Sequence, residues 1–310
     1  DMISDSTNTW VPSMRRYIDE EALMKLIQRQ GYLDFLRRNR ERPIIKVVSG
    51  IRRCGKSTLF RLFKDELLAD NVKPEQIISI NFEELEYEHL RDYHALYRYI
   101  LERMQPNETN YIFLDEIQHV DQFHRVVDSL FVKENTDLYI TGSNAYFMSS
   151  DIATLLTGRY VKIQMLPLSF SEFYHSKYDG NQYSLIPAYE SYLRESSFPY
   201  TQQLGGEDFD IQEYLRGLYN TLLLHDVVAR LKINDVTILQ DIVRYIMANV
   251  GSLLSPNKIA NSLVSAGRKI DNKTVERYLQ GLQDSLLLYK VNRYDVRGKE
   301  LLRINAKYYS

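Results

Sequence analysis

The sequence has little of what several common folds and binding sites require. Its 310 residues include one cysteine, Cys54, which excludes an internal disulfide framework and a cysteine-rich zinc site within this chain. The six histidines show no HExxH motif and no paired metal-ligand spacing. No apolar run approaches the roughly 20 residues that a membrane-spanning helix needs. We therefore expect a cytoplasmic protein without a histidine- or cysteine-based metal centre.

The chain also has almost no excess of one charge sign, because its formal net charge is only −2. The charges are nevertheless unevenly distributed along the sequence. Residues 251–310 contain eleven lysines and arginines against five acidic residues, a balance of +6, so the rest carries −8. A basic segment of this kind favours an anionic partner. A solvated basic face without a partner is the alternative.

The length exceeds a usual single core, so we expect two or three domains. Residues 1–13 are polar and lack periodicity, which indicates a flexible leader or an expression remnant without the layout of a signal peptide. Residues 14–42 have apolar positions at helical spacing, with Gly31 as a break. This helical lead-in opens a first domain that we place at residues 14–166.

Short apolar segments alternate with helical patterns through that domain. They span residues 44–49, 77–82, 111–115, 138–141 and 160–164. Continuous apolar strands alternating with helices predict an α/β fold with a five-stranded parallel sheet covered on both faces. Ligands of such sheets bind at the carboxyl ends of the strands, so polar residues there are candidate functional residues.

The segment after the first strand has the pattern G-x-x-x-x-G-K-[ST], which is typical of a phosphate-binding P-loop. Glycines let the backbone approach a polyphosphate, and the next helix directs N–H groups and its positive dipole end at the anion. Lys56 would reach the terminal phosphates, and the hydroxyl of Ser57 would bind Mg²⁺. The predicted loop consists of Gly50, Ile51, Arg52, Arg53, Cys54, Gly55, Lys56, Ser57 and Thr58.

Two adjacent carboxylates, Asp115 and Glu116, end the third strand. Downstream of a P-loop, such a pair suits a nucleotide site: Asp115 would orient the magnesium shell, and Glu116 would accept a proton from the attacking water. A solvated turn is the alternative. The additional strand between the loop and the pair favours the hydrolysing branch of these folds and disfavours a small-molecule kinase.

Three further polar residues lie at strand ends or on the rim of the sheet. Asn144, next to Ser143 after the fourth strand, would touch the γ-phosphate or the water, although Gly-Ser-Asn is also good turn material. Asn81 would restrain Glu116, or else cap its strand. Arg159 would enter a neighbouring subunit's site as an arginine finger, or else interact with a helix dipole as a C-terminal cation.

Beyond residue 166 the pattern becomes helical. Residues 167–235 predict a helical lid, and residues 236–310 predict a winged helix-turn-helix, with Ser255 and Asp271 starting two short helices and Gly267 ending the first. Double-stranded DNA is the expected partner of its basic face, and a protein-protein joint is the alternative. The residues that would contact DNA are Asn272, Lys273, Thr274, Arg277, Arg297 and Lys299.

As a set, the segments GIRRCGKST, LDEIQ, TGSNA, LLTGRY with PLSFSEF, and SFPY with HDVVAR resemble the prokaryotic AAA-superfamily ATPases of the archaeal-ATPase-like branch. The resemblance spans residues 16–309. It implies a Walker A motif at residues 50–58, a Walker B motif at Asp115 and Glu116, a sensor at Asn144 and a finger at Arg159. Arg230 is only a candidate for a second sensor. In that family a C-terminal nuclease-like domain follows the winged helix, about where this chain ends.

The leading interpretation is a Mg²⁺-dependent ATPase that couples its nucleotide state to self-association and to DNA or a protein client. The alternatives are a nucleotide-gated DNA-binding regulator with little hydrolysis, and an assembly ATPase whose winged helix joins proteins. The position of Cys54 at a helix N-terminus also suggests a redox switch, because such a position lowers a thiol's pKa. A small filler residue is the preferred alternative for Cys54.

Overall fold

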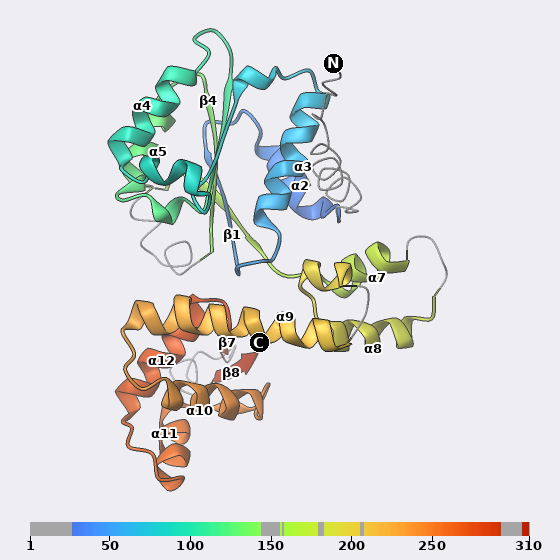
Figure 1. Cartoon of the computed structure of the whole chain (residues 1–310), viewed down its shortest axis with the longest axis vertical. Coiled ribbons are helices and arrows are strands. Elements are labelled where there is room, and N and C mark those ends of the chain that lie inside the picture. Colours follow the sequence, from blue (N-terminus) through green and yellow to red (C-terminus); the bar gives the residue numbers. More distant parts are fainter. Residues whose placement is uncertain are drawn as a thin grey trace, which may run out of the picture.

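The computed structural model describes residues 27–143, 156, 158–178, 183–204, 208–292 and 306–309. The first half of this part forms a three-layer α/β core (Figure 1). Its elements are α2 (Gln30–Asn39), β1 (Ile45–Gly50), α3 (Lys56–Ala69), η1 (Pro74–Gln76), β2 (Ile77–Asn81), η2 (Leu85–Leu90), α4 (Tyr93–Arg103), β3 (Asn110–Asp115), η3 (Ile117–His119), α5 (Phe123–Phe131), β4 (Thr136–Gly142) and β5 (Tyr160–Met165).

The five strands form one parallel sheet in the order β2-β3-β4-β1-β5. Each predicted strand is present with bounds that differ by at most two residues, and the predicted fold class is confirmed. Strand β4 lies between the strand that leads into the P-loop and the strand that ends in the acidic pair. The carboxyl ends of β1, β3 and β4 therefore meet at one edge of the sheet.

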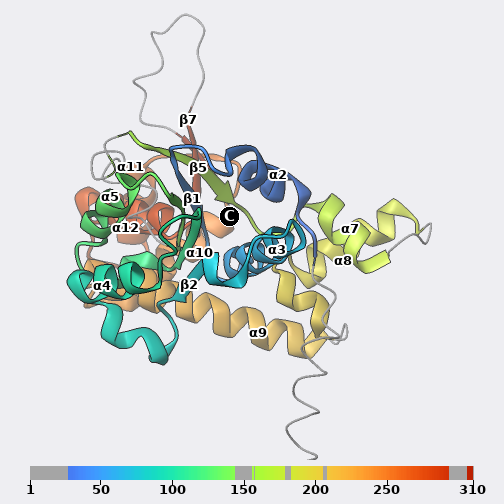
Figure 2. The same cartoon turned by 90° about the horizontal axis from the view of Figure 1, so that it is seen from above.

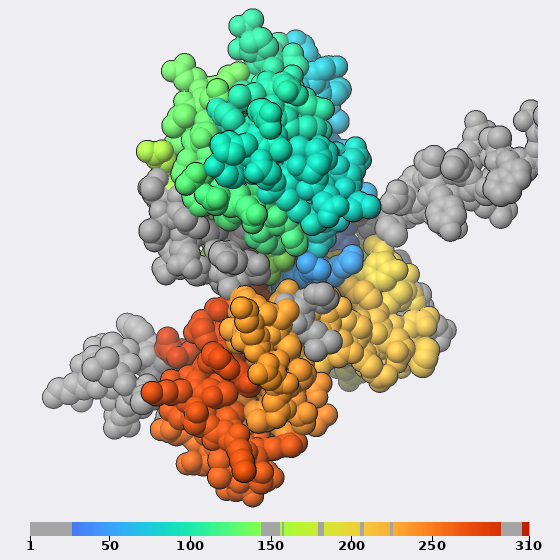
Figure 3. Space-filling model, turned by 60° about the vertical axis from the view of Figure 1, so that its left-hand side comes forward, coloured from blue at the N-terminus to red at the C-terminus, as the bar shows by residue number. Residues whose placement is uncertain are grey.

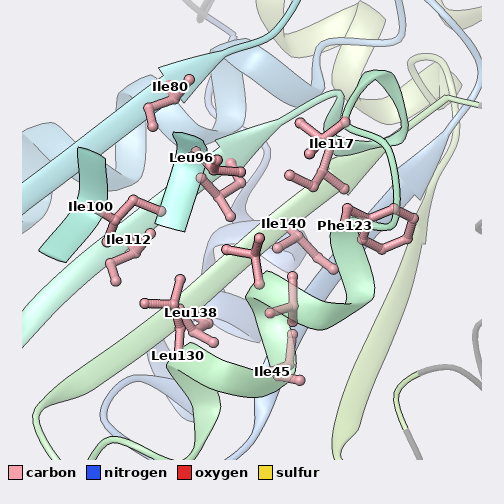
Figure 4. Packing of buried hydrophobic residues seen from close by; sticks show 14 of the residues in the cluster. Ile45, Ile80, Leu96, Ile100, Ile112, Ile117, Phe123, Leu130, Leu138 and Ile140 are labelled. Atoms are coloured by element: carbon pink, nitrogen blue, oxygen red, sulfur yellow. The ribbon is translucent and has the colours of Figure 1, made fainter. Parts of the chain in front are cut away.

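Alternate side chains of each strand pack against different helices, which is why both faces of the sheet are buried. One cluster joins Ile45 and Val47 to Leu96 of α4 and Leu130 of α5 (Figure 4). The other cluster joins the opposite face of the sheet to α2 and α3. The two helical layers fix the sheet whose edge carries the candidate site.

A buried ion pair links the beginning of β1 to β4. Lys46 and Asp137 are almost completely buried and contact each other directly, while Tyr139 donates a hydrogen bond of 2.6 Å to Asp137. Lys46 also donates to the carbonyl of Arg42 at 2.9 Å. Because an unpaired buried charge is strongly unfavourable, each partner requires the other. The pair fixes β1 beside β4 and so helps to place the P-loop beside the end of β4.

The second half of the described chain is mainly helical. The α7–α8 helix pair projects to one side of the core (Figure 2), and α9 runs between the core and the C-terminal helices (Figure 1). No helix among the described residues is long and apolar enough to cross a membrane. The elements are α7 (Phe170–Tyr178), α8 (Leu185–Glu195), η5 (Pro199–Gln203), α9 (Asp208–Thr221), η6 (Leu222–Ala229), α10 (Val236–Met247), β6 (Leu253–Leu254), α11 (Pro256–Ser265), α12 (Asn272–Asp284), β7 (Tyr289–Asn292) and β8 (Ala306–Tyr309).

The C-terminal lobe, α10 to β8, has its own apolar core and a small antiparallel sheet in the order β6-β8-β7. The helix starts follow the predicted chemistry: the side chains of Ser255 and Asp271 accept hydrogen bonds from the backbone N–H groups of Lys258 and Thr274. Gly267 has a φ of +85°, which favours glycine after a helix end. This order of elements is compatible with the predicted winged helix-turn-helix. Arg297 and Lys299 lie outside the described residues.

Candidate functional site

The predicted P-loop connects β1 to α3 at the carboxyl edge of the sheet. At Gly50 a side chain has no room, because a Cβ would lie 2.4 Å from the carbonyl oxygen of Met165. Gly55 has a φ of +103° and immediately precedes the first residue of α3. The two glycines of the motif are thus required for different reasons, one by close packing against β5 and one by backbone conformation.

The side chain of Lys56 is buried and lies between the loop and the acidic pair. Its Nζ is 3.1 Å from Oε1 of Glu116 and donates to the carbonyl oxygens of Gly50 at 3.2 Å and Ile51 at 3.4 Å. Burial lowers the pKa of Lys56, but the neighbouring Cys54 and Glu116 raise it, and the net direction is upward. A permanent positive charge is therefore held at the predicted phosphate site.

Asp115 contacts the two elements on either side of it. The hydroxyl of Thr141, on β4, donates to Asp115 Oδ1, and the side chain of Ser57 also hydrogen-bonds to Asp115. Burial raises the pKa of Asp115, and these hydrogen bonds oppose the rise. Mg²⁺ prefers oxygen ligands and takes only one or two from a protein when it is bound with phosphates. The contact between Ser57 and Asp115 fits that donor set.

The described residues offer no larger set of such ligands. They contain no group of three or more histidine, cysteine, aspartate or glutamate side chains that would hold a metal ion. A Mg²⁺ ion held by Ser57 and Asp115 would take its remaining oxygen ligands from nucleotide phosphates and water.

Glu116 faces Lys56 because its backbone is left-handed, with a φ of 54°. Its N–H donates to the hydroxyl of Thr141 at 2.9 Å. Its carboxylate accepts hydrogen bonds from the side chains of Gln118 and Ser143. Burial raises the pKa of Glu116, but the charge of Lys56 and these hydrogen bonds lower it below its usual value. The carboxylate is therefore ionised at neutral pH, as a general base must be.

The contacts of Asn81 favour the cap over the restraint of Glu116, the two roles that the sequence left open. Asn81 does not reach Glu116: its side chain donates to Glu84 at 3.1 Å and accepts from the N–H of Glu83 at 3.1 Å. The residue that restrains Glu116 is Gln118, which sequence reasoning missed. The available signal was the glutamine two positions after the acidic pair in LDEIQ.

A cavity of about 300 Å³ opens beside the P-loop. The loop, the beginning of α3 and Glu116 form one wall; Arg29 and Glu83 add charged groups, and the remaining lining side chains are apolar or uncharged. The latter are Ile27, Met165, Leu168, Pro199, Tyr200 and Gln203. The predicted lead-in thus contributes Ile27 to the cavity, while α2 itself begins only at Gln30 and includes Gly31 in its first turn.

The remaining loop residues have varied environments. Arg52 pairs with Glu83 at 3.0 Å, and Arg53 is exposed with a φ of 67°. Thr58 is half-buried and lines the cavity. Cys54 is completely buried, and burial raises the pKa of its thiol despite the nearby Lys56. This environment contradicts the redox-switch interpretation and favours a small filler.

Arg159 lies at the opposite edge of the sheet, directly before β5. It is exposed, and its guanidinium carbon is 5.6 Å from the centre of the Phe131 ring. Arg230, the candidate second sensor, instead contacts α12 through Asp284 at 3.2 Å and the carbonyl of Gly281 at 3.2 Å. It does not line the cavity beside the P-loop. Asn144 lies outside the described residues.

The fold and the arrangement of the P-loop and acidic pair define the class: a P-loop protein of the AAA type. A family model described as an AAA domain matches residues 42–174, and a second, described as a domain of unknown function (DUF8612), matches residues 186–310. An uncharacterized protein of Haemophilus influenzae is 38% identical over 287 residues, which cover 92% of this chain and 71% of that protein. The chain belongs to this family of AAA-domain proteins, as the resemblance implied.

Two further similarities extend the comparison. An uncharacterized protein of Methanocaldococcus jannaschii is 32% identical over 276 residues, which cover 83% of this chain and 58% of that protein. Among solved structures, the Walker-type ATPase PABY2304 of Pyrococcus abyssi superposes with a TM-score of 0.59. It shares 17% sequence identity, over 91% of this chain and 93% of that one. At this identity the similarity concerns the fold alone.

Proposed function

We propose that the protein is a Mg²⁺-dependent ATPase that converts ATP to ADP and phosphate. One observation carries the proposal: an ionised, buried Glu116 lies 3.1 Å from Lys56 at the mouth of a P-loop. A lysine and a carboxylate so placed serve a reaction in which water attacks a phosphate. Membership of the AAA-domain family supports the same conclusion.

In this proposal each residue has a separate task. Lys56 exchanges its carbonyl and carboxylate partners for the terminal phosphate oxygens and neutralises charge that develops on them. Glu116, released from Lys56, accepts the proton of the attacking water while Gln118 holds its other oxygen. Ser57 and Asp115 hold Mg²⁺, which polarises the phosphates when it is bound.

The apolar walls of the cavity suit the other end of the nucleotide. Pro199 and Tyr200 line the cavity from η5. Ile27 lines it from the segment before α2, and Leu168 from the segment after β5. Apolar walls with a few polar groups are typical of sites that bind a planar ring system. We assign the adenine base to this part of the cavity, with the amide of Gln203 available for hydrogen bonds.

Phosphate release tests the activity directly. We expect the purified protein to release phosphate from ATP in the presence of Mg²⁺ and to stop when the ion is chelated, because one or two protein oxygens cannot replace its charge. Readdition of excess Mg²⁺ should restore the rate, which controls for damage by the chelator. Release at an unchanged rate in the chelator would contradict the Mg²⁺ dependence, and no release under any condition would favour the regulator with little hydrolysis.

The C-terminal lobe is the proposed site of coupling to double-stranded DNA. Lys273 and Arg277 are exposed one turn apart near the start of α12, and Lys258 and Lys269 are exposed on α11 and in the following turn. Thr274 and Asn272 are half-buried on the same helix turn. Lysines and arginines at the start of such a helix suit phosphates and base edges. A joint to a protein client is the alternative use of the same surface.

The salt dependence of binding separates these two partners. If Lys273 and Arg277 contact phosphates, replacing both by alanine should weaken duplex binding and reduce the slope of log K against log salt by about 2, since each contact contributes about 0.9. The matched control replaces Lys73 and Arg98, two exposed residues on the surface of the α/β domain, by alanine and should leave the slope unchanged. Fluorescence anisotropy with labelled duplex at several salt concentrations measures the affinity and the slope for each variant. Absence of binding at low salt would favour the protein joint.

A further inference from the structure

Arg29, which directly precedes α2, is buried, with 4% of its surface exposed, and joins segments that are distant in the sequence. Its Nη1 donates to the carbonyl oxygen of Cys54 in the P-loop at 3.3 Å and to that of Leu166 at 2.6 Å. Its Nη2 donates to the carbonyl of Pro167 at 3.1 Å. Its Nε and Nη2 form a forked ion pair with the carboxylate of Glu172, at 2.8 and 2.9 Å. The guanidinium therefore bridges the P-loop, the segment after β5 and the first turn of α7.

Glu172 is held firmly at the α7 end of this bridge. Its Oε2 also accepts hydrogen bonds from the N–H and the hydroxyl of Ser169, at 2.8 and 2.9 Å. Burial raises the pKa of Glu172, but the hydrogen bond from Arg29 and those from Ser169 lower it below its usual value. A forked pair between two charged groups is stronger and more directional than a single hydrogen bond. Movement of Arg29 is thus transmitted to the start of α7.

The P-loop end of the bridge involves the peptide group that joins Cys54 to Gly55. Because a trans peptide is planar, its C=O and N–H point in opposite directions. Arg29 binds the C=O of Cys54, so the N–H of Gly55, a residue that lines the cavity beside the loop, is directed away from Arg29. A phosphate that accepts from this N–H polarises the peptide and strengthens the bond from Arg29 to its carbonyl.

Arg29 lies beside two cavities. It lines both the 300 Å³ cavity beside the P-loop and a larger apolar cavity of about 800 Å³. The larger cavity is lined by Ile51 of the P-loop, Leu218 of α9 and Leu288 of the C-terminal lobe, and Ile51 and Leu218 also belong to one buried apolar cluster. Figure 3 shows the core, in cyan and green, above the C-terminal lobe, in orange and red.

We propose that Arg29 is a positioning residue that couples nucleotide binding at the P-loop to the order of α7 through Glu172. The inference rests on the proposed binding of ATP and goes beyond it, because it names the link through which the site communicates with the helices outside the core. Coupling is reciprocal: if nucleotide strengthens the link, the link strengthens nucleotide binding by the same factor.

Hydrogen exchange with and without a non-hydrolysable ATP analogue tests the link. In the wild type the analogue should slow exchange both at residues 50–58 and at residues 170–178. In Glu172→Gln, which weakens the forked pair, protection of the P-loop should remain while the added protection of α7 is lost, and the analogue should bind about tenfold more weakly. Arg29→Lys keeps the charge but cannot form the two parallel hydrogen bonds to Glu172. It should therefore also keep the protection of the P-loop and lose the added protection of α7.

A second forked pair in the same region provides the control. Arg37 of α2 binds Glu66 of α3 at 2.8 and 2.6 Å, three turns along α3 from the P-loop. Glu66→Gln should therefore leave both protections and the affinity unchanged. Added protection of α7 that persists in both Glu172→Gln and Arg29→Lys, or is missing in a wild type whose P-loop is protected, overturns the coupling. A wild type without P-loop protection overturns the proposed nucleotide binding and the coupling with it.

Discussion

Replacing Glu116 by glutamine is expected to abolish steady-state ATP turnover while nucleotide binding persists. The amide has nearly the same shape as the carboxylate and still fits between Lys56 and Gln118, but it cannot accept a proton from water. General-base catalysis typically contributes a factor of about 10² to 10⁴. The variant also frees Lys56 from an ion pair, so ATP affinity should stay equal to that of the wild type or rise.

Two measurements separate the roles of Glu116. Phosphate release reports turnover, and titration with a fluorescent ATP analogue reports affinity. Glu84→Gln is the matched control, because Glu84 is an exposed carboxylate that hydrogen-bonds to Asn81 at the end of the neighbouring strand. It should turn over ATP at the wild-type rate. Turnover that survives in Glu116→Gln would show that another group is the base.

The sheet was predictable because its signal is local. A strand buried on both faces must be apolar at nearly every position, and the runs that end at Gly50 and Asp115 meet that requirement. The helix starts at Ser255 and Asp271 were predictable for the same reason, since a cap is set by adjacent residues. The change from α9 to the π-helix η6 was not, because one apolar pattern runs through both.

The candidate site was predictable only where it depends on a motif. The P-loop and acidic pair follow from spacing, but the partners of Glu116 depend on a left-handed backbone that turns its side chain toward Lys56 and Gln118. Adjacency of strands β2 and β3 suggested Asn81 as one such partner, but the contacts of its side chain favour the cap. Arg29 and Glu172 are 143 positions apart, so no local pattern pairs them.

If Arg159 is the arginine finger that the sequence suggests, its position requires that it act on another copy of the chain. Its carbonyl accepts from the N–H of Ile45, the first residue of β1, whereas the P-loop begins at Gly50, at the other end of that strand. The five residue steps from Ile45 to Gly50 separate the two by about 17 Å at roughly 3.3 Å per residue. An arginine side chain cannot span that distance through the sheet.

Arg159→Ala is therefore expected to lower turnover strongly without changing ATP affinity. Arginine fingers contribute a factor of about 10³ to 10⁵, so the loss should approach that range. The specific activity of the wild type should rise with protein concentration as copies associate, and the variant should lose this dependence. Arg125→Ala is the matched control. Arg125 lies on α5, the helix that carries Phe131, and its guanidinium likewise lies over an aromatic ring, that of Tyr93.

Mixing two inactive variants gives the most decisive result. Glu116→Gln keeps Arg159 but lacks the base, and Arg159→Ala keeps the base but lacks the arginine. If Arg159 acts across an interface, a mixed assembly contains pairs in which an intact Glu116 meets an intact Arg159, and turnover should reappear in proportion to their frequency. If the arginine served its own chain or only stabilised a helix end, the mixture would stay as inactive as its parts. Recovery on mixing would thus establish both the assembly and the direction in which the residue works.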